Sequence, residues 1–83
     1  MLSPNKIKDI IIKNLDCEWV DVKGDDGTHF EALVVSRLFD KISTIKQHQL
    51  VYEALGNMME QEIHALSIKT MTPNSWEEKN KKE

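Results

Sequence analysis

Two strand-like segments of the sequence flank a long amphipathic helix, and this order restricts the fold more than any other feature. The segments are HFEALVVS at 29–36 and IHALSIK at 63–69. The first is rich in β-branched and aromatic residues, and the second places Leu66 and Ile68 on one face, as half-buried strands do. A strand, a helix and a second strand form a crossover connection, which is right-handed and makes the two strands parallel. The first residues of both strands then lie at the same end of the sheet.

A histidine stands at or near the start of each of these strands. His29 opens the first segment, and His64 is the second residue of the other. If the parallel strands are neighbours, the two imidazoles lie about 5 Å apart laterally, and about 10 Å apart if another strand lies between them. We therefore expect two histidines that are distant in sequence to share one rim of the sheet.

Caps, turns and apolar spacing predict the elements at the start of the chain. Ser3 followed by Pro4 is typical of a helix start, and apolar residues recur at helical spacing over 4–15. Val20 and Val22 alternate with Trp19 and Asp21, before the turn-forming residues GDDG at 24–27. The chain thus begins with a helix, a strand and a turn into the next strand.

The long helix is predicted from its cap and its apolar stripe. Ser36 can first cap a short helical turn, and Thr44 with Gln47 then fits a capping box. Gly56 leaves the C-terminal end of the helix open. The stripe, which we expect to face the core, contains Ile45, His48, Val51, Tyr52, Leu55, Met58 and Met59.

The complete order of elements is α-β-β-α-α-β-α, with Thr72 and Pro73 opening a last helix that carries Trp76. This order predicts an α+β fold, in which a small three-stranded mixed sheet is covered by helices on one face. We assign residues 1–76 to a single domain. Residues 77–83 are charged or polar throughout, and we expect them to form a disordered tail.

Size and composition exclude several classes of function. The chain has 83 residues, a formal net charge of −3 and 40% hydrophobic residues. A chain of this size buries about 60% of its extended surface, which allows one thin core and little room for a deep active site. The sequence has no nucleophile elbow, no phosphate-binding glycine loop and no pair of carboxylates that we can place on one face. It therefore does not predict an enzyme.

The cellular location is inferred from what the sequence lacks. No apolar run approaches the roughly 20 residues that cross a bilayer, and the first residues lack the apolar core of a signal peptide. Cys17 is the single cysteine, which excludes a disulfide framework and a self-contained four-thiolate metal site. We expect a cytoplasmic protein without a membrane partner, in which Cys17 is a buried and inert thiol.

Several motifs together resemble the BolA family, and most closely its IbaG-like branch. They are GDDGTHFEALVVS at 24–36, Phe39 with Asp40, HQLVYEAL at 48–55 and IHALSIKTMTPNSW at 63–76. The resemblance extends over nearly the whole chain, from about Ile7 to Trp76. The family fold is similar to the type II KH domain, which agrees with the order of elements predicted above.

The resemblance implies an adaptor. BolA-like proteins pair with monothiol glutaredoxins and share a two-iron two-sulfur cluster, to which the glutaredoxin contributes a cysteine and glutathione contributes a thiol. Carried over to this sequence, the ligand of the HALSIK segment is His64, and the ligand at the loop or strand edge is His29. Some members use a loop cysteine, but the loop GDDGT has none.

Iron chemistry is compatible with these two ligands. Neutral imidazole ligates two-iron two-sulfur clusters and raises their potential relative to all-thiolate ligation. Because the ligating nitrogen must be deprotonated, acidification toward the reference imidazole pKa of about 6.5 should weaken ligation. Two ligands cannot hold a cluster alone, so we expect the isolated chain to lack a cofactor. We also expect the isolated chain to be a monomer or a weak homodimer.

Ordinary structural roles compete with each functional interpretation. A single histidine in a small domain is most often structural or solvated, and for His48 we favour a packed, hydrogen-bonded core residue. Trp76 is expected to pack in the core. Trp19 either covers the core or contacts a partner.

The alternative function is that of a KH-like, DNA-binding regulator of the stress response. The basic residues available for phosphate contacts are Arg37, Lys41 and Lys46. However, KH domains clamp the nucleic-acid backbone with a GxxG loop, and the corresponding stretch FDKIST contains no glycine. The net negative charge also predicts weak and strongly salt-dependent binding.

Overall fold

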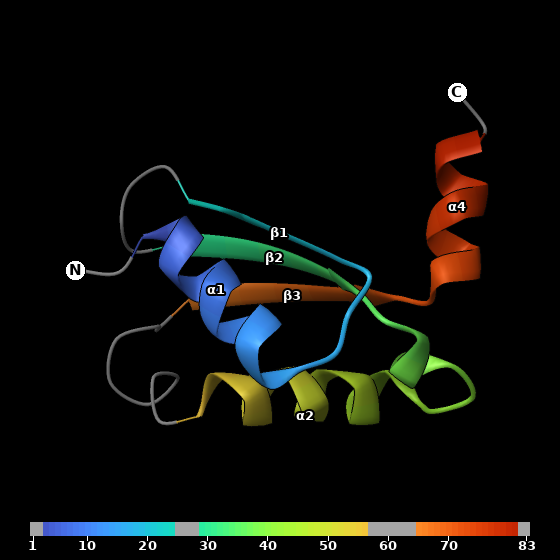
Figure 1. Cartoon of the computed structure of the whole chain (residues 1–83), viewed down its shortest axis with the longest axis horizontal. Helices are drawn as coiled ribbons and strands as arrows, with labels where there is room; N and C mark the ends of the chain where they lie inside the picture. Colours follow the sequence, from blue (N-terminus) through green and yellow to red (C-terminus); the bar gives the residue numbers. More distant parts are fainter. Residues whose placement is uncertain (1–2, 25–28, 57–64, 82–83) are drawn as a thin grey trace.

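The computed structural model describes residues 3–24, 29–56 and 65–81. Its elements follow the predicted order, and the α+β fold class is confirmed (Figure 1). They are helix α1 (Pro4–Asn14), strand β1 (Trp19–Lys23), strand β2 (His29–Val35), the 3-10 helix η1 (Arg37–Phe39), helix α2 (Thr44–Leu55), strand β3 (Ala65–Met71) and helix α4 (Pro73–Lys81).

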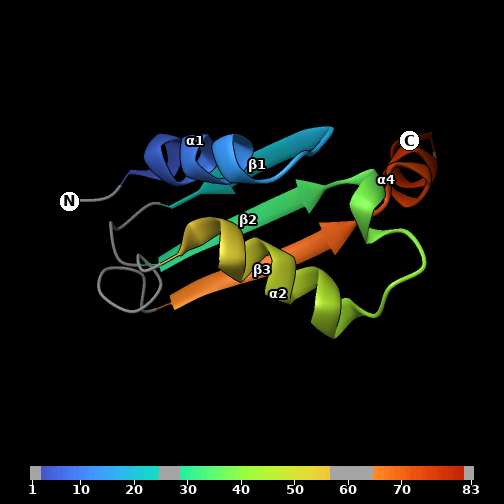
Figure 2. The same cartoon turned by 60° about the horizontal axis from the view of Figure 1, so that its bottom comes forward.

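The described strands form one mixed sheet in the order β1-β2-β3. β1 and β2 are antiparallel, whereas β2 and β3 are parallel, as the crossover predicts. Helices α1 and α2 lie over the same face of the sheet (Figure 2). Helix α4 follows the end of β3 and rises on the other side, beyond the strand ends (Figure 1). In the part of the chain that the structure describes, one face of the sheet is therefore largely open.

The core lies between the sheet and the two helices α1 and α2. Alternation along β2 directs Phe30, Ala32 and Val34 toward the helices, and each is at most 3% exposed. The core cluster contains Ile7, Ile11, Leu15, Val20, Val22, Phe30, Ala32, Val34, Phe39, Val51, Ala54 and Leu55, with Leu66 and Ile68 of β3 packed against it. Burial of these apolar side chains between the sheet and the two helices stabilises the fold.

The predicted apolar stripe of α2 is partly wrong. Val51 and Leu55 are buried, but Ile45 is 71% exposed and Tyr52 is 41% exposed. The buried face includes Ala54 instead, at the place where α2 meets α1 and the Ala54 backbone oxygen accepts a hydrogen bond from Asn14 Nδ2 (3.0 Å). His48 is only half-buried and lies outside the core cluster, and Met58 and Met59 lie outside the described residues.

The cap of α2 also differs from the predicted capping box. The N-cap is Ser43, whose Oγ accepts a hydrogen bond from the backbone N–H of Lys46 (3.2 Å). Gln47 instead donates from Nε2 to the carbonyl oxygens of Phe39 (3.0 Å) and Ile42 (3.2 Å), and its Oε1 accepts from Thr70 Oγ1 (2.5 Å). Gln47 thus connects the segment after β2 to β3.

Trp76 does not enter the core cluster. It stacks on Trp19, with ring centroids 5.5 Å apart and an interplanar angle of 23°. Trp19 is in register with Val35, which is in register with Met71. Val35 is fully buried although alternation places it on the open face, so the end of this face is covered where α4 approaches it.

Two further predictions concern the N-terminal cap and the C-terminal tail. Ser3 caps α1 by accepting a hydrogen bond from the N–H of Lys6 (3.2 Å), as predicted. At the other end, α4 continues past residue 76, where we placed the start of the tail, and ends at Lys81. Most of the turn GDDG lies outside the described residues.

Ser36 joins four segments of the fold. Its side chain is fully buried, and Oγ donates to the carbonyl oxygen of Asp16 (2.7 Å) and accepts from the N–H of Leu38 (3.1 Å). Its backbone N–H donates to the carbonyl oxygen of Met71 (3.1 Å). The ends of β2 and β3, the entry to β1 and η1 therefore meet at one residue.

Replacing Ser36 by alanine should destabilise the fold by about 1–3 kcal/mol, because two part-buried backbone groups lose their hydrogen-bond partner. Urea unfolding followed by circular dichroism measures this change. The matched control is Ser67→Ala on the exposed face of β3, which we expect to change the free energy of unfolding by at most about 0.5 kcal/mol. Equal stability of the two variants would contradict the role given to Ser36.

Candidate functional site

The candidate ligands lie at the end of the sheet where β2 and β3 begin. His29 is exposed and is the first residue of β2, and it is in register with Ala65, the first residue of β3. The two parallel strands are direct neighbours, which is the closer of the two arrangements considered above (Figure 2). His64 precedes Ala65 in the sequence but lies outside the described residues.

The position of His29 is fixed by the residue that follows it. Phe30 is 2% exposed and belongs to the core, so alternation places His29 on the opposite face of β2. At the end of β1, Gly24 lies close to the Phe30 ring, and a Cβ atom there would come within 2.6 Å of Phe30 Cδ1. The absence of a side chain at Gly24 therefore allows Phe30 to pack and sets the start of β2.

A Gly24→Ala variant should lose about 1–3 kcal/mol of stability, because the Phe30 ring must move in a packed core. The movement should also shift the NMR signals of the His29 ring. Gly56→Ala is the matched control: its Cβ meets no atom within 4 Å, but its φ of +64° makes the substitution cost about 1–3 kcal/mol. Unchanged His29 signals in Gly24→Ala would exclude this coupling.

Cys17 is remote from this rim. It precedes β1, whose first residue, Trp19, pairs with Val35 at the far end of β2, roughly 20 Å along the strand from His29. Its Sγ donates to the carbonyl oxygen of Leu15 (3.2 Å). Burial raises the pKa of the Cys17 thiol, and the neighbouring carboxylates of Asp16 and Glu18 raise it further. This environment disfavours the thiolate that nucleophilic attack or metal ligation requires.

Cys17 should therefore react slowly with iodoacetamide at pH 8. A raised pKa lowers the thiolate fraction at that pH, so the rate should keep increasing as the pH passes the ordinary thiol pKa of about 8.5. The same chain unfolded in urea is the control, and it should react faster at pH 8. Equal rates for the folded and unfolded chains would show that the fold does not suppress the thiolate.

Among the residues in the described ranges, no three histidine, cysteine or acidic side chains gather into a possible metal site. His29 therefore needs ligands from outside these residues to hold a metal. His48 lies on α2, which is a different element from the rim, so it does not extend the candidate set.

The three basic residues of the DNA alternative differ in their surroundings. Arg37 forms ion pairs with Asp16 (2.8 Å) and Glu18 (3.3 Å), and Glu18 also accepts a hydrogen bond from the backbone N–H of Arg37 (2.9 Å). Lys41 and Lys46 are exposed on the segment after η1 and on the first turn of α2. A phosphate group at Arg37 would have to displace two carboxylates.

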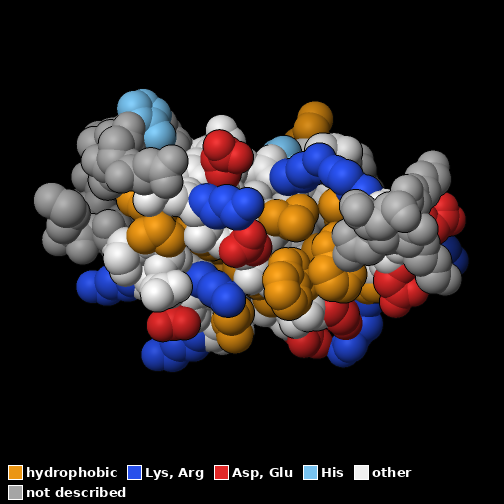
Figure 3. All heavy atoms as spheres, turned by 90° about the horizontal axis from the view of Figure 1, so that it is seen from above, with side chains coloured by type: hydrophobic (Ala, Val, Ile, Leu, Met, Phe, Trp, Pro, Cys, Tyr) orange, Lys and Arg blue, Asp and Glu red, His pale blue; other side chains and the backbone are white. Residues whose placement is uncertain are grey.

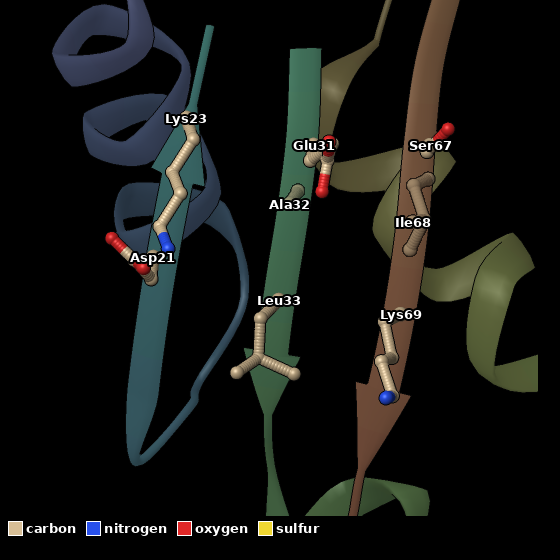
Figure 4. A pocket seen from close by; sticks show the side chains of 8 residues that line it. All are labelled: Asp21, Lys23, Glu31, Ala32, Leu33, Ser67, Ile68 and Lys69. Atoms are coloured by element: carbon tan, nitrogen blue, oxygen red, sulfur yellow. The ribbon is translucent and has the colours of Figure 1, made fainter.

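Sequence reasoning missed a second feature, a shallow cavity on the open face of the sheet. Its volume is about 220 Å³, and it is lined by Asp21, Lys23, Glu31, Ala32, Leu33, Ser67, Ile68 and Lys69 (Figure 4). Each strand alternates regularly, so six of these residues could have been assigned to the open face once the strand order was known, whereas Ala32 and Ile68 belong to the face covered by the helices. No motif in the sequence marks them.

Comparison with known proteins supports the fold described above. The family model described as BolA-like protein matches residues 13–75. The chain belongs to the BolA family. It is 40% identical to the acid stress protein IbaG of Escherichia coli over 73 residues, which are 87% of this chain and 86% of that protein.

Solved structures of other BolA proteins share the fold. A bolA protein homologue from Coxiella burnetii superposes with a TM-score of 0.83 at 42% identity, covering 93% of this chain and 99% of the other. The BolA domain of SufE1 from Arabidopsis thaliana gives a TM-score of 0.75 at 32% identity, covering 90% and 99%. In the part of this BolA-family chain that the structure describes, no helix is long and apolar enough to span a membrane.

Proposed function

We propose that this BolA-family protein is an adaptor that binds a monothiol glutaredoxin and co-ligates a two-iron two-sulfur cluster through His64 and His29. The observation that carries the proposal is the parallel register of His29 with Ala65, the residue directly after His64. This register supports placing both imidazoles at one rim. A bound cluster would supply electron-transfer or cluster-donation chemistry that the polypeptide lacks.

The exposure and the ligands of the rim suit a cluster site shared with a partner better than a site that this chain completes alone. His29 is exposed, so a second protein can approach it without unfolding any element. The described residues provide no thiolate near the rim, since Cys17 lies at the other end of β2 and its pKa is raised. The remaining ligands must come from the glutaredoxin and glutathione, which makes this chain one half of a site.

The other classes of function receive less support. Arg37, one of three residues considered for DNA binding, is engaged by Asp16 and Glu18. For an enzyme, the described residues line cavities of about 220 Å³ on the open face and about 470 Å³ between α1 and α2, and neither lining includes a histidine or a cysteine. An adaptor that acts through its surface fits a fold of this size.

The test is a mixture of the purified chain with cluster-loaded monothiol glutaredoxin, followed by visible circular dichroism. The parent chain should change the cluster spectrum, because imidazole replaces a thiolate at iron. His64→Ala should abolish the change, and His29→Ala should weaken it. The matched control is His48→Gln on α2, which should behave like the parent.

Binding and ligation must be measured separately. We expect His64→Ala to remain bound to the glutaredoxin in a pull-down while the cluster spectrum reverts. If His64→Ala gave the parent spectrum and the parent cluster lifetime, the ligand assignment would be abandoned. If the parent chain failed to bind the glutaredoxin at all, the adaptor role itself would be wrong.

A further inference from the structure

The open face of the sheet carries two rows of side chains that the strand register aligns. One row is Asp21, Leu33 and Lys69, and the other is Lys23, Glu31 and Ser67, each with one residue from β1, β2 and β3. Figure 4 shows these side chains together on the side of the sheet away from α1 and α2. Acidic and basic side chains alternate around apolar ones on this face (Figure 3).

This face belongs to a mixed sheet that contains one parallel pair of strands. All-parallel sheets are nearly always covered on both faces, whereas antiparallel sheets tolerate one face in water. Here the parallel strands β2 and β3 are covered by helices on one face, and on the other only their ends lie near the Trp19–Trp76 stack. Leu33, at the centre of the row formed with Asp21 and Lys69, remains only half-buried. Within the described ranges, no second layer covers the middle of the face.

The charge around Lys69 points to an acidic group in that layer. A hydrogen bond that Lys69 donates to the side-chain nitrogen of Lys79 on α4 and the positive charge of Lys69 both lower the pKa of Lys79. The two side-chain nitrogens are thus held close together, where a second positive charge is disfavoured. A carboxylate placed between or above them would relieve their repulsion.

We propose that the open face docks on the same face of a second copy of this chain, turned end for end. A twofold axis that runs across the strands between the two rows places each strand over its own copy in the opposite direction. Asp21 then faces Lys23 of the second copy, and Lys23 faces Asp21 of the second copy. Glu31 of the second copy comes one strand away from Lys69, near the Lys69–Lys79 pair.

The charges on the face select this orientation. With the axis along the strands instead, Asp21 would face Lys69 of the second copy, but Glu31 would face Glu31 of the second copy, which is a repulsive contact. The same operation would bring α4 against α4, because this helix rises on the open side at one end of the sheet (Figure 1). Turning the second copy end for end separates the two α4 helices and leaves no like charges opposed in the two rows.

The footprint predicts a weak dimer. Three strands at their usual spacing, each contributing five to seven residues, cover roughly 300 Å². A stable complex buries about 800 Å² per partner, so we expect a dissociation constant on the order of 0.1–1 mM. The dimer should therefore appear only in concentrated solution.

The experiment uses charge reversal and mixing in sedimentation equilibrium, with the full chain at up to about 1 mM. The average mass of the parent should rise with concentration toward that of a dimer. Asp21→Lys alone and Lys23→Asp alone should each remain monomeric, because like charges then face each other. An equimolar mixture of the two variants should regain the dimer, because the introduced lysine of one variant faces the introduced aspartate of the other only in the mixed pair.

The controls are Asp9→Lys and Lys6→Asp, which change the net charge equally at exposed positions of α1. Both should dimerise as the parent does. Mixing changes no monomer, so recovery in the mixture cannot arise from altered folding of either variant. A parent chain that stays monomeric, single variants that dimerise normally, or a mixture that stays monomeric would each overturn the proposal.

Discussion

The buried hydroxyl group of Ser36 is the interaction on which the rest of the structure depends. It ties the carbonyl group of Asp16 to the N–H group of Leu38, while its own backbone N–H reaches the end of β3 at Met71. Because strands are stiff, fixing the ends of β2 and β3 against each other also fixes the register at their beginnings, where His29 stands opposite Ala65. A polar residue at one end of the sheet thus contributes to the strand register that positions His29 at the other end.

The features that the sequence predicted correctly are those set by local chemistry or by chain topology. The cap at Ser3, the extended strand before η1 and the parallel pairing of β2 with β3 follow from caps, β-branched residues and the crossover. The position of His29 at the rim follows from the same crossover. The distance between β2 and β3 does not follow from the crossover, because the chain order is equally compatible with another strand between them.

The errors concern contacts between distant segments. On α2, apolar periodicity assigned Ile45 and Tyr52 to the core, but packing against α1 favours the small Ala54, which allows close approach. Gln47 fitted a capping box, yet its amide group satisfies two carbonyl groups after β2 and the hydroxyl group of Thr70. A sequence window of a few residues contains none of these partners, so periodicity and cap motifs cannot reveal them.

The two ends of the sheet differ in whether their polar groups are available to a partner. At the end where β2 and β3 finish, internal contacts satisfy the polar groups: Ser36 is buried, Arg37 is held by Asp16 and Glu18, and Trp76 covers part of Trp19. Displacing Ser36 or the Trp19–Trp76 stack for a partner would break contacts that hold the fold together, and binding at Arg37 would break its two ion pairs. The exposed imidazole of His29 and the charged rows of the open face can be engaged with their backbone positions unchanged. In a chain with one thin core, partner binding is therefore expected at the rim and on the open face, and not at the end of the sheet that contains Arg37.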